Sequence, residues 1–348
     1  MLVTVVVITR NEGPRLRLVL ESLAAQDLGS EGPSEKVDLE VVVVDDASSD
    51  ETREVLADAQ RVLPLRVLRH EVCRGRSAAR NDGVRAASGE VVVLLDGDCL
   101  ASPRLVARHA AMHARRERTV GRGETYHVRS TRFFRDPETG EPFSGEDARV
   151  ARMGNEREGA LVTRHQIRTC FEKIAGRAEP GIYAGASPRR LYELEMRALG
   201  SVPEAGVLWM TAPGQNMSMR RADFEAVGGF DEGLTLNEHR ELAFRLYELG
   251  RRMVPVYGCR SIHMLHRSGW RDPLEERSWE RRFYRAHPCL AVKLMSVFWL
   301  TLARDGDIPP EAAIGSLEQL EEIVRNGSAF DYDALRRTHP RLVDLDSE

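Results

Sequence analysis

Lysine is nearly absent from the 348-residue sequence. Lys36, Lys173 and Lys293 are the three lysines, so arginine supplies the other 47 of the 50 basic residues. A GC-rich coding sequence explains such a bias, and phosphate recognition by the bidentate guanidinium group is the alternative. The formal net charge is −4, so the chain has no overall positive charge that would favour nucleic acid as a partner.

Paired cysteines are missing as well. The five cysteines lie far apart in the sequence and form no C-x-x-C pair. This pattern argues against a disulfide framework and against a zinc cluster, and it fits a reducing compartment such as the cytoplasm. The five are Cys73, Cys99, Cys170, Cys259 and Cys289.

The sequence also lacks long hydrophobic runs. None approaches the ~18 apolar residues of a membrane span. The longest, LAVKLMSVFWLTLA at 290–303, is interrupted by Lys293 and predicts a buried helix. The alternative is a peripheral membrane contact through the C-terminal helices. The opening MLVTVVVITRNE has no basic segment before its apolar residues, which indicates a first strand and not a signal peptide.

What the first 120 residues do contain is an alternation of apolar runs and helical patterns. LVTVVVI, LEVVVVDD, LRVLRH and VVVLL are rich in β-branched residues, as expected of strands buried on both faces. The stretches between them repeat small or apolar residues at helical spacing. This alternation predicts an α/β fold, with a mostly parallel sheet and helices on both faces.

The rest of the sequence divides into three parts. Residues 121–205 are rich in Arg, Glu and Gly, which indicates a variable insertion with some helix near 189–199. Regular patterns return over 206–270, where NEHRELAFRLYELG is helical and RMVPVYG suits a last strand. Residues 271–348 have a helical pattern and predict a C-terminal extension.

Two aspartates end the strand VVVLL, in the sequence DGD. Asp96 and Asp98 are two residues apart, so in an extended segment both side chains point the same way. Two such carboxylates repel each other unless a cation or hydrogen bonds intervene. Hard oxygen ligands suit Mg²⁺ or Mn²⁺, which bind through one or two carboxylates together with substrate phosphates. The pair therefore predicts a site for a metal and a diphosphate.

Polar residues also follow the other predicted strands. Thr9, Arg10, Asn11 and Glu12 follow the first strand, and Asp45-Asp46 follows the second. In an open parallel sheet, ligands bind outside the carboxyl ends of the strands, so these groups are expected to converge. The two aspartates could accept from a base N–H group or from ribose hydroxyls. Three arginines in CRGRSAARNDG could contact phosphate or base edges, or could lie on a solvated helix face: Arg74, Arg76 and Arg80.

Taken in order, these elements resemble a family 2 glycosyltransferase of the GT-A fold. The resemblance rests on VVVITRNEGPRLRLVLESL, VVVVDDASSDET, RGRSAARNDGVRAASGEVVVLLDGDC, GQNMSMRRADFEAVGGFDE and EHRELAFRLYELG. These cover a little over half the chain. The resemblance implies a nucleotide-sugar-binding half at 1–120 and an acceptor and catalytic half at 206–270. Nothing comparable is implied for 121–205 or 271–348, and acceptor choice is expected to lie in these two parts.

The resemblance also implies ligands and site residues. It implies a nucleotide-diphosphate-sugar donor, with UDP favoured, and Mn²⁺ or Mg²⁺ as cofactor. The DGD stands for the family's DXD motif, in which Asp96 faces the ribose or the metal and Asp98 binds the metal. The residues expected at the nucleotide sugar are Thr9, Arg10, Asn11, Glu12, Asp45, Asp46, Arg76, Arg80, Asp96 and Gly97. Trp209, Gln215 and Asn216 are expected at the acceptor or at the donor sugar.

A further metal ligand, commonly histidine in GT-A enzymes, is expected after the last strand. In GCRSIHMLHRSGW both His263 and His266 are candidates, and His263 comes sooner after the strand. Arg267, Ser268 and Trp270 are expected in a loop that closes over the donor.

The expected catalytic base departs from the family's pattern. The family takes its base from a Glu-Asp pair at the start of the helix after GGFDE, and here the pair reads Glu238-His239. Histidine can act as a base near neutral pH, and Glu238 can do so if burial raises its pKa. Glu238 could equally be an acidic residue favoured by the helix dipole.

The sequence therefore predicts a metal-dependent glycosyltransferase that acts on an acceptor hydroxyl, with inversion expected. A nucleotidyltransferase is the first alternative, although TRNEGPR has one glycine where a triphosphate-binding loop needs several. A non-catalytic sugar-nucleotide-binding protein is the second alternative. The sequence leaves the sugar, the acceptor and the oligomeric state open, and it predicts a cytoplasmic protein with peripheral membrane attachment as the alternative.

Overall fold

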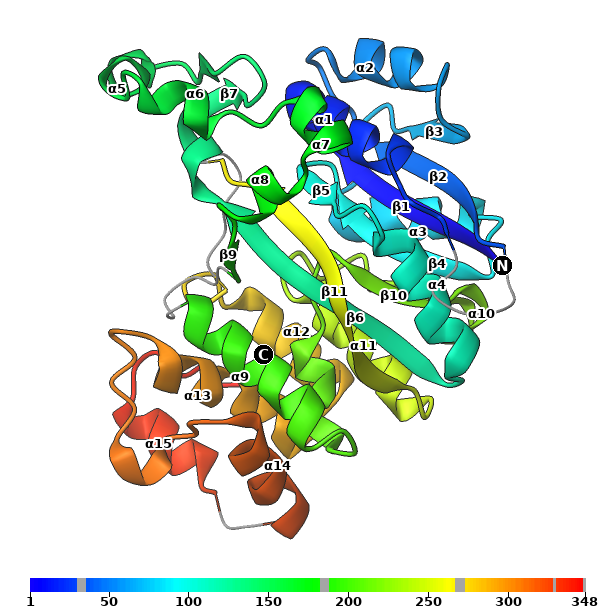
Figure 1. Ribbon diagram of the computed structural model, residues 1–348. Coiled ribbons are helices and arrows are strands. Elements are labelled where there is room, and N and C mark those ends of the chain that lie inside the picture. The colour runs from blue at the N-terminus through cyan, green and yellow to red at the C-terminus, as the bar shows by residue number, and fades with distance from the viewer. Residues whose placement is uncertain (30–35, 182–187, 267–272, 328–329, 347–348) are drawn as a thin grey trace.

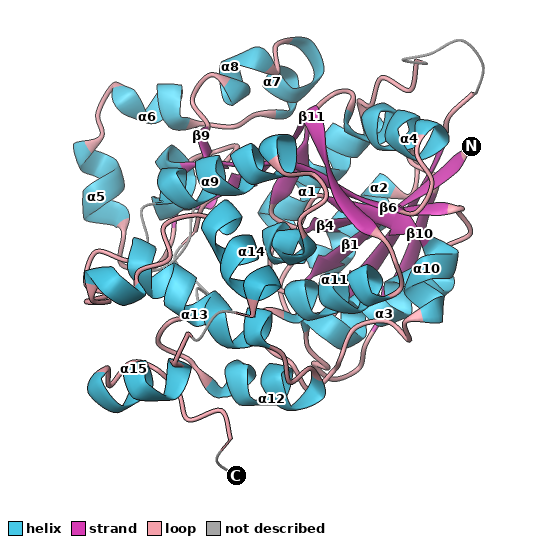
Figure 2. Ribbon diagram, turned by 90° about the horizontal axis from the view of Figure 1, so that it is seen from below, coloured by secondary structure: helices cyan, strands magenta, loops and turns pink. Residues whose placement is uncertain are grey.

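The computed structural model describes residues 1–29, 36–181, 188–266, 273–327 and 330–346 of the chain. A central sheet carries helices on both faces, and a group of C-terminal helices packs beside it (Figure 1). Figure 2 shows the same sheet from below, with these helices gathered on one side. The predicted α/β fold with a mostly parallel sheet is confirmed.

Nine strands form the central sheet, in the order β3-β2-β1-β4-β10-β6-β11-β5, with β9 paired to β6. The pairings within β3-β2-β1-β4 and between β6 and β11 are parallel. Since β10 is antiparallel to both β4 and β6, the six longest strands all run in one direction. Their carboxyl ends therefore meet at one edge. The strands are β1 (Leu2–Thr9), β2 (Asp38–Asp45), β3 (Leu65–Arg69), β4 (Val91–Asp96), β5 (Cys99–Ala101), β6 (Thr119–Val128), β9 (Glu179–Pro180), β10 (Met217–Arg220) and β11 (Arg252–Met264).

The apolar runs of the sequence form the strands that are buried on both faces. Successive side chains of a strand point to opposite faces, so Val5 and Val7 pack on one side of the sheet and Val6 packs on the other. The first side is covered by α1 (Gly13–Ala24), α2 (Thr52–Ala59) and α4 (Leu105–Arg115). The second is covered by α3 (Arg76–Ala86), α9 (Pro188–Ser201), the 3₁₀ helix η2 (Gly206–Thr211) and α11 (Glu238–Glu248).

The C-terminal extension is helical, as predicted, and belongs to the same hydrophobic core. The run at 290–303 forms α13, and ten of its thirteen residues are buried, which confirms the buried helix. Within the described residues, no helix has the length and apolar character needed to cross a membrane. The helices of this part are α12 (Ser278–Ala286), α13 (Leu290–Leu302), α14 (Leu317–Asn326) and α15 (Tyr332–Thr338), with the 3₁₀ helix η3 (Pro310–Ala312).

The segment 121–205 begins inside the sheet. Its first residues belong to β6, which pairs with β11 over ten residues, so the part outside the sheet begins at Arg129. The helix predicted near 189–199 is present as α9. The remaining elements gather beside α1 in Figure 1. They are η1 (Arg129–Phe133), β7 (Phe134–Asp136), β8 (Glu141–Pro142), α5 (Asp147–Arg152), α6 (Glu156–Ala160), α7 (Arg164–Thr169) and α8 (Glu172–Ala175). Outside this segment, the short helix α10 (Arg221–Ala226) follows β10.

Two histidines of α4 are buried against the sheet. His109 Nε2 lies 2.9 Å from Asn216 Oδ1, and His113 Nε2 lies 2.9 Å from Ser218 Oγ. Burial lowers the pKa of His109 from 6.5 to about 4 and the pKa of His113 to about 3. Both rings are therefore neutral in the folded protein at neutral pH.

These two histidines predict a loss of stability in acid. In the unfolded chain each takes up a proton near pH 6.5, so their contribution is complete above that pH and falls as pH drops towards 4. Lowering pH from 7 to 5.5 is expected to reduce the free energy of unfolding by about 2 to 3 kcal/mol through this pair. Urea denaturation at both pH values measures it. In a His109→Gln/His113→Gln variant the decrease should be smaller by that amount, and an unchanged decrease would contradict the assignment.

Candidate active site

The candidate active site lies at the sheet edge where the carboxyl ends of the parallel strands meet. Asp96 ends β4 beside Ile8 of β1, and the chain then turns into β5. Because β5 runs antiparallel to β11, Cys99 pairs with His263, and the Met264 N–H donates to the Asp98 carbonyl at 2.9 Å. This pairing brings the DGD turn against residues about 165 positions later in the chain.

Asp98 and both candidate histidines form one cluster. His266 Nε2 is 3.0 Å and His263 Nε2 is 3.4 Å from the same oxygen, Asp98 Oδ2. One ligand atom from each residue lies within 4.8 Å of the others. Burial alone would raise the pKa of Asp98, but the two imidazoles outweigh it and hold that pKa well below its ordinary value. A carboxylate and two imidazoles that converge in this way can hold a divalent cation, and the nitrogen donors suit Mn²⁺ better than Mg²⁺.

Asp96 is held by an arginine, and with Asp98 and Cys99 it forms a second group whose ligand atoms lie within 4.8 Å of one another. Arg80 Nη2 donates to Asp96 Oδ1 at 2.9 Å and to the Gly214 carbonyl at 3.0 Å. Arg80 Nη1 donates to Glu238 Oε1 at 2.7 Å. The guanidinium is 2% exposed and lies 5.5 Å from the ring centre of Phe230. Arg80 was expected at the nucleotide, and the structure instead places it between the DGD turn and the start of α11.

Glu238 is buried at the N-terminus of α11. Burial favours its neutral form, but His239 and the charge of Arg80 outweigh that effect and lower its pKa far below the ordinary value. The charge of Arg76, the first residue of α3, contributes to the low pKa of Glu238. Burial and the charge of Asp98 raise the pKa of Asp96, and Arg80 and Arg76 offset that rise in part. Glu238 is therefore a carboxylate at neutral pH.

His239 is poorly suited to accept a proton. Its Nε2 lies 2.7 Å from Arg240 Nη1, and because a guanidinium only donates, Nε2 must accept. The remaining proton of the neutral ring is then on Nδ1, which is 3.8 Å from Glu238 Oε1. Burial lowers the pKa of His239 to about 4. The rise in the Glu238 pKa that the sequence made a condition for its role as base is absent, because His239 and Arg80 outweigh burial. Glu238 is a weak base as a result, but of the two candidates it is the one whose lone pairs include some not held by Arg240.

The aspartates after β2 are engaged within their own loops. Asp46 accepts from the backbone N–H groups of Arg74 at 2.7 Å and Gly75 at 2.9 Å, and its Oδ1 lies 2.7 Å from His70 Nδ1. Burial would raise the pKa of Asp46, but these hydrogen bonds lower it. Asp45, 1% exposed, accepts from the Ser48 N–H and from Arg69 Nη1. Asp46 thus holds the segment that leads into α3, whereas Asp45 holds the loop after β2 and the end of β3.

Of the residues after β1, Arg10 and Asn11 contact neighbouring loops, whereas Glu12 faces the metal-ligand cluster. Asn11, at φ +56°, accepts from the Ser49 N–H, and Arg10 is exposed with Nη1 3.0 Å from Cys73 Sγ. Glu12 turns towards the metal-ligand cluster, with Oε1 3.6 Å from His266 Nε2. Burial raises the pKa of Glu12.

Thr9 and Gly97 pack against each other. A side chain at Gly97 would place Cβ 2.9 Å from the Thr9 Cβ and Oγ1 and 3.0 Å from the Ile8 carbonyl oxygen. Glycine is therefore required between the two aspartates, because the DGD turn lies directly on β1. Within the described part of the chain, the buried Thr9 hydroxyl has no hydrogen-bond partner.

Two residues expected at the sugar lie in the core instead. Trp209 is 1% exposed and makes edge contacts with Phe244, so its indole presents no face to a ligand. Asn216 is fully buried, and its amide donates to the carbonyls of Glu124 and Cys259, both at 2.9 Å. These bonds tie β10 to β6 and β11. Gln215 is partly exposed, and its buried side-chain oxygen has no hydrogen-bond partner among the residues that the structure describes. Arg267, Ser268 and Trp270 lie outside the described residues.

One residue of this site was missed from the sequence. His127 lies on β6 in register with His263, and their Nδ1 atoms are 3.1 Å apart. Burial lowers the pKa of His127 well below its ordinary value. The stretch TVGRGETYHV alternates apolar with other residues and carries this histidine near its end, which is the pattern of a strand with a polar residue at its tip. The stretch was instead interpreted as the start of an insertion.

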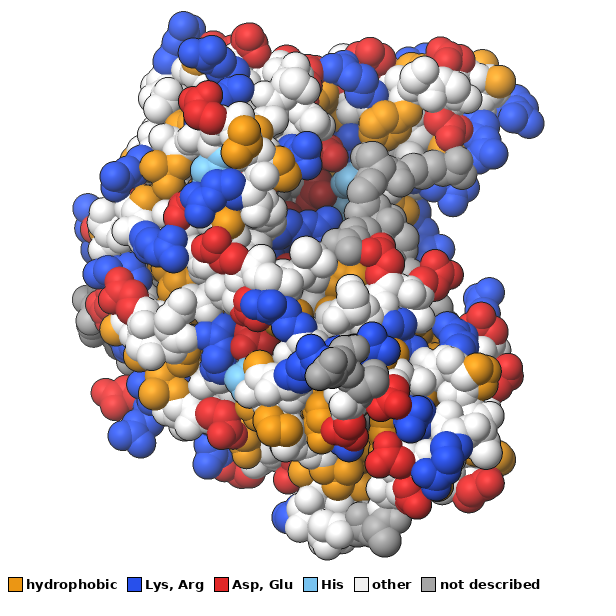
Figure 3. Space-filling model, turned by 180° about the vertical axis from the view of Figure 1, so that it is seen from behind, with side chains coloured by type: hydrophobic (Ala, Val, Ile, Leu, Met, Phe, Trp, Pro, Cys, Tyr) orange, Lys and Arg blue, Asp and Glu red, His pale blue; other side chains and the backbone are white. Residues whose placement is uncertain are grey.

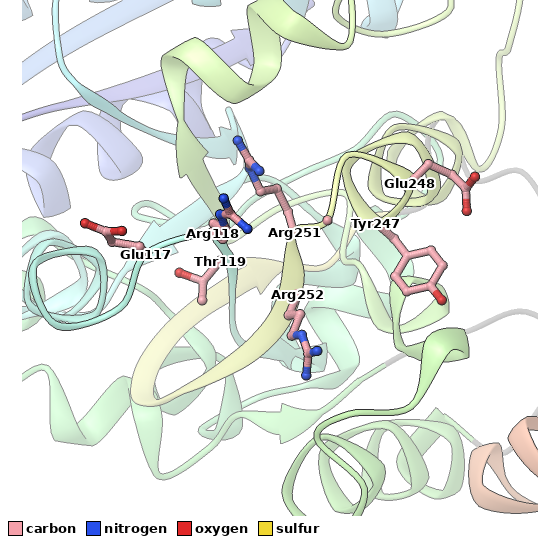
Figure 4. A pocket seen from close by; sticks show the side chains of 8 residues that line it. Glu117, Arg118, Thr119, Tyr247, Glu248, Arg251 and Arg252 are labelled. Atoms are coloured by element: carbon pink, nitrogen blue, oxygen red, sulfur yellow. The ribbon is translucent and has the colours of Figure 1, made fainter.

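Figure 3 shows a hollow in the molecular surface where acidic, basic and histidine side chains meet. A separate cavity of about 690 Å³ lies at the opposite end of β6 and β11, at their first residues (Figure 4). There Arg251 and Arg252 point to opposite sides, and Arg251 is paired with Asp223. Because ligands of such sheets bind at the carboxyl ends of strands, the Asp98 edge is the better candidate.

Comparison with known proteins identifies the class of enzyme to which this fold and site correspond. The family model for glycosyl transferase family 2 matches residues 4–177, which is half of the chain. The chain belongs to glycosyl transferase family 2.

Among individual relatives, validoxylamine A glucosyltransferase of Streptomyces hygroscopicus subsp. jinggangensis is 28% identical over 317 residues. The match covers 87% of this chain and 64% of that protein. The uncharacterized glycosyltransferase YfnE of Bacillus subtilis is 33% identical over 117 residues, which cover 34% of this chain and 28% of YfnE. The chain thus spans less than two thirds of the length of these relatives.

Solved structures share the fold at low sequence identity. Residues 1–349 of TarS from S. aureus align with a TM-score of 0.52 and 18% identity, covering 96% of this chain and 83% of that one. GalNAc-T7, solved with UDP, GalNAc and Mn²⁺, aligns with a TM-score of 0.54 and 16% identity, covering 97% of this chain and 56% of its own. These similarities support the predicted GT-A architecture.

Proposed function

We propose that the chain is a metal-dependent glycosyltransferase. It transfers a sugar from a nucleotide diphosphate, with UDP as the favoured nucleotide, to an acceptor hydroxyl, and the configuration of the sugar carbon is inverted. The observation that carries the proposal is the convergence of Asp98, His263 and His266 at the ligand-binding edge of the sheet, where Arg80 links Glu238 to the neighbouring Asp96. A TarS structure with UDP-GlcNAc and the GalNAc-T7 structure with UDP and Mn²⁺ make UDP-sugars and Mn²⁺ the first ligands to test.

The roles follow from the chemistry of the residues. Asp98, His263 and His266 would hold the cation, which when bound would offset the negative charge of the leaving nucleotide diphosphate. Arg76 adds positive charge on the same side. Glu238, kept ionised by Arg80, would take the proton of the acceptor hydroxyl as that oxygen attacks the sugar. A single displacement with one base inverts the sugar carbon. Acceptor choice is assigned to 121–205 and the C-terminal helices.

One observation favours a second candidate, a protein that binds a sugar nucleotide without transferring the sugar. His239 stands where the family has aspartate, its Nε2 is engaged by Arg240, and Glu238 is paired with Arg80. The two candidates share the donor site and differ in turnover.

A donor panel tests the proposal. UDP-sugars and GDP-sugars are added to the protein with Mn²⁺ or with EDTA, and the unfolding temperature is recorded. A ligand present at 100 times its Kd stabilises the protein that binds it by about 2.7 kcal/mol. A UDP-sugar at such a concentration is therefore expected to raise the unfolding temperature by a few degrees with Mn²⁺ and to leave it unchanged with EDTA. Release of UDP then measures turnover. Binding without release supports the second candidate, and no metal-dependent binding by any donor refutes both.

A further inference from the structure

The histidine pair on β6 and β11 links the buried sheet to the candidate metal site. The parallel register places His127 beside His263, and their rings meet edge to face at 76° with Nδ1 atoms 3.1 Å apart. His127 is 6% exposed. Two imidazole nitrogens at this distance attract only if one carries a proton and the other presents its lone pair. The pair therefore has two arrangements.

In the first arrangement His127 Nδ1–H donates to His263 Nδ1. The proton of the neutral His263 ring is then on Nε2, which can donate to Asp98 Oδ2 at 3.4 Å. In the second arrangement His263 Nδ1–H donates to His127, so the Nε2 lone pair of His263 faces the Asp98 carboxylate. That juxtaposition is repulsive unless a cation lies between the two. Each ring keeps one proton in both arrangements. Passing from the first to the second moves the Nδ1 proton from His127 to His263, releases the Nε2 proton of His263 to water and takes a proton from water at His127 Nε2.

We propose that His127 is a positioning residue for the divalent cation site: it accepts from His263 Nδ1–H and thereby fixes His263 with its Nε2 lone pair towards the metal. This rests on the proposed metal dependence. His127 reaches the site only through His263, because its Nδ1 is directed at that ring. Metal-bound histidines in proteins commonly donate their other N–H to such a partner, and losing the partner costs about 10- to 100-fold in metal affinity. The unusual feature here is that the partner is a second, buried histidine from the neighbouring strand.

Two substitutions separate positioning from packing. His127→Phe keeps a ring of similar size and removes the acceptor, whereas His127→Asn places an amide oxygen near the position of Nδ1. Binding of Mn²⁺ alone is measured by calorimetry, without donor or turnover. His127→Phe is expected to weaken Mn²⁺ binding by about 10- to 100-fold, and His127→Asn is expected to stay within about threefold of the wild type. His165→Phe, on the exposed face of α7, controls for loss of a histidine elsewhere.

The outcomes distinguish this inference from the proposed function. If the wild type binds no Mn²⁺, the proposed metal dependence fails and the inference falls with it. If the wild type binds Mn²⁺, Asp98→Ala does not, and His127→Phe binds as tightly as the wild type, the inference alone is overturned. Equal losses in the Phe and Asn variants would also overturn it, because packing would then explain both.

A second measurement does not depend on how the variants fold. Long-range ¹H–¹⁵N spectra of histidine-labelled wild-type protein, recorded with the diamagnetic ion Zn²⁺, report which nitrogen of His263 is protonated. Protonation of Nδ1 in the presence of Zn²⁺ supports the inference, and protonation of Nε2 overturns it.

Discussion

Replacing Asp98 with alanine is expected to reduce metal-dependent sugar transfer by about 1,000-fold, which corresponds to about 4 kcal/mol of transition-state stabilisation. Asp98 is the carboxylate of the candidate metal site, and both histidine Nε2 atoms converge on its Oδ2. Without it, two imidazoles remain, and the negative charge that attracts the cation is lost. The initial rate of UDP release, measured across a range of Mn²⁺ concentrations, tests this expectation.

The matched control for this variant is Asp58→Ala on α2, where the carboxylate is exposed and paired only with Arg61 at 3.6 Å. Asp58→Ala should retain wild-type activity. Full activity of Asp98→Ala at moderate Mn²⁺ would remove Asp98 from the mechanism. Recovery only at very high Mn²⁺ would show that the loss is one of metal affinity.

Replacing Glu238 with glutamine is expected to lower kcat for transfer by about 100- to 10,000-fold, the usual contribution of a general base. Glutamine keeps an oxygen that can accept from Arg80, so the buried contact and donor binding should change little. The separation of kcat from donor affinity is the informative readout, because loss of the fold would reduce both.

The neighbouring histidine provides the contrast. His239→Gln keeps an acceptor for Arg240 near the position of Nε2, and kcat is expected to change by less than about threefold because that lone pair is already engaged. A loss as large as that of Glu238→Gln would place the base on His239. Unchanged kcat in both variants would remove Glu238 and His239 from the mechanism and leave the base to another group.

The low pKa of Glu238 also bears on the pH dependence of activity. Because Arg80 and His239 keep the carboxylate ionised, its proton-accepting form is expected to persist well below pH 4. Any loss of activity in mild acid would then come from another group, such as His266, whose pKa Asp98 raises against the effect of burial and which must be unprotonated to bind a cation.

Much of the fold followed from local pattern. Continuous β-branched runs predicted strands buried on both faces, and their alternation with helical spacing predicted the parallel sheet. The DGD motif at the end of β4 could be assigned from sequence because two carboxylates at i and i+2 are a local arrangement. The buried helix at 290–303 could also be predicted, since Lys293 interrupts an otherwise apolar run.

The errors arose where neighbours come from distant parts of the chain. Trp209 and Asn216 lie in or beside a motif shared with the family, but their burial depends on α11 and on the contacts among β10, β6 and β11. No sequence spacing reports such contacts. His127 was overlooked because the composition of 121–205 hides a sheet strand at its start.

The sequence by itself determined the order of the strands along the chain, the family and the carboxylates at the strand ends. Only the tertiary structure decided which groups these carboxylates meet. Pairing of β5 with β11 places Asp98 between His263 and His266, and the packing of α3 against α11 directs Arg80 to Asp96 and Glu238. The physical reason is that periodicity specifies which face of an element is buried, whereas strand register and helix packing specify which side chains become neighbours.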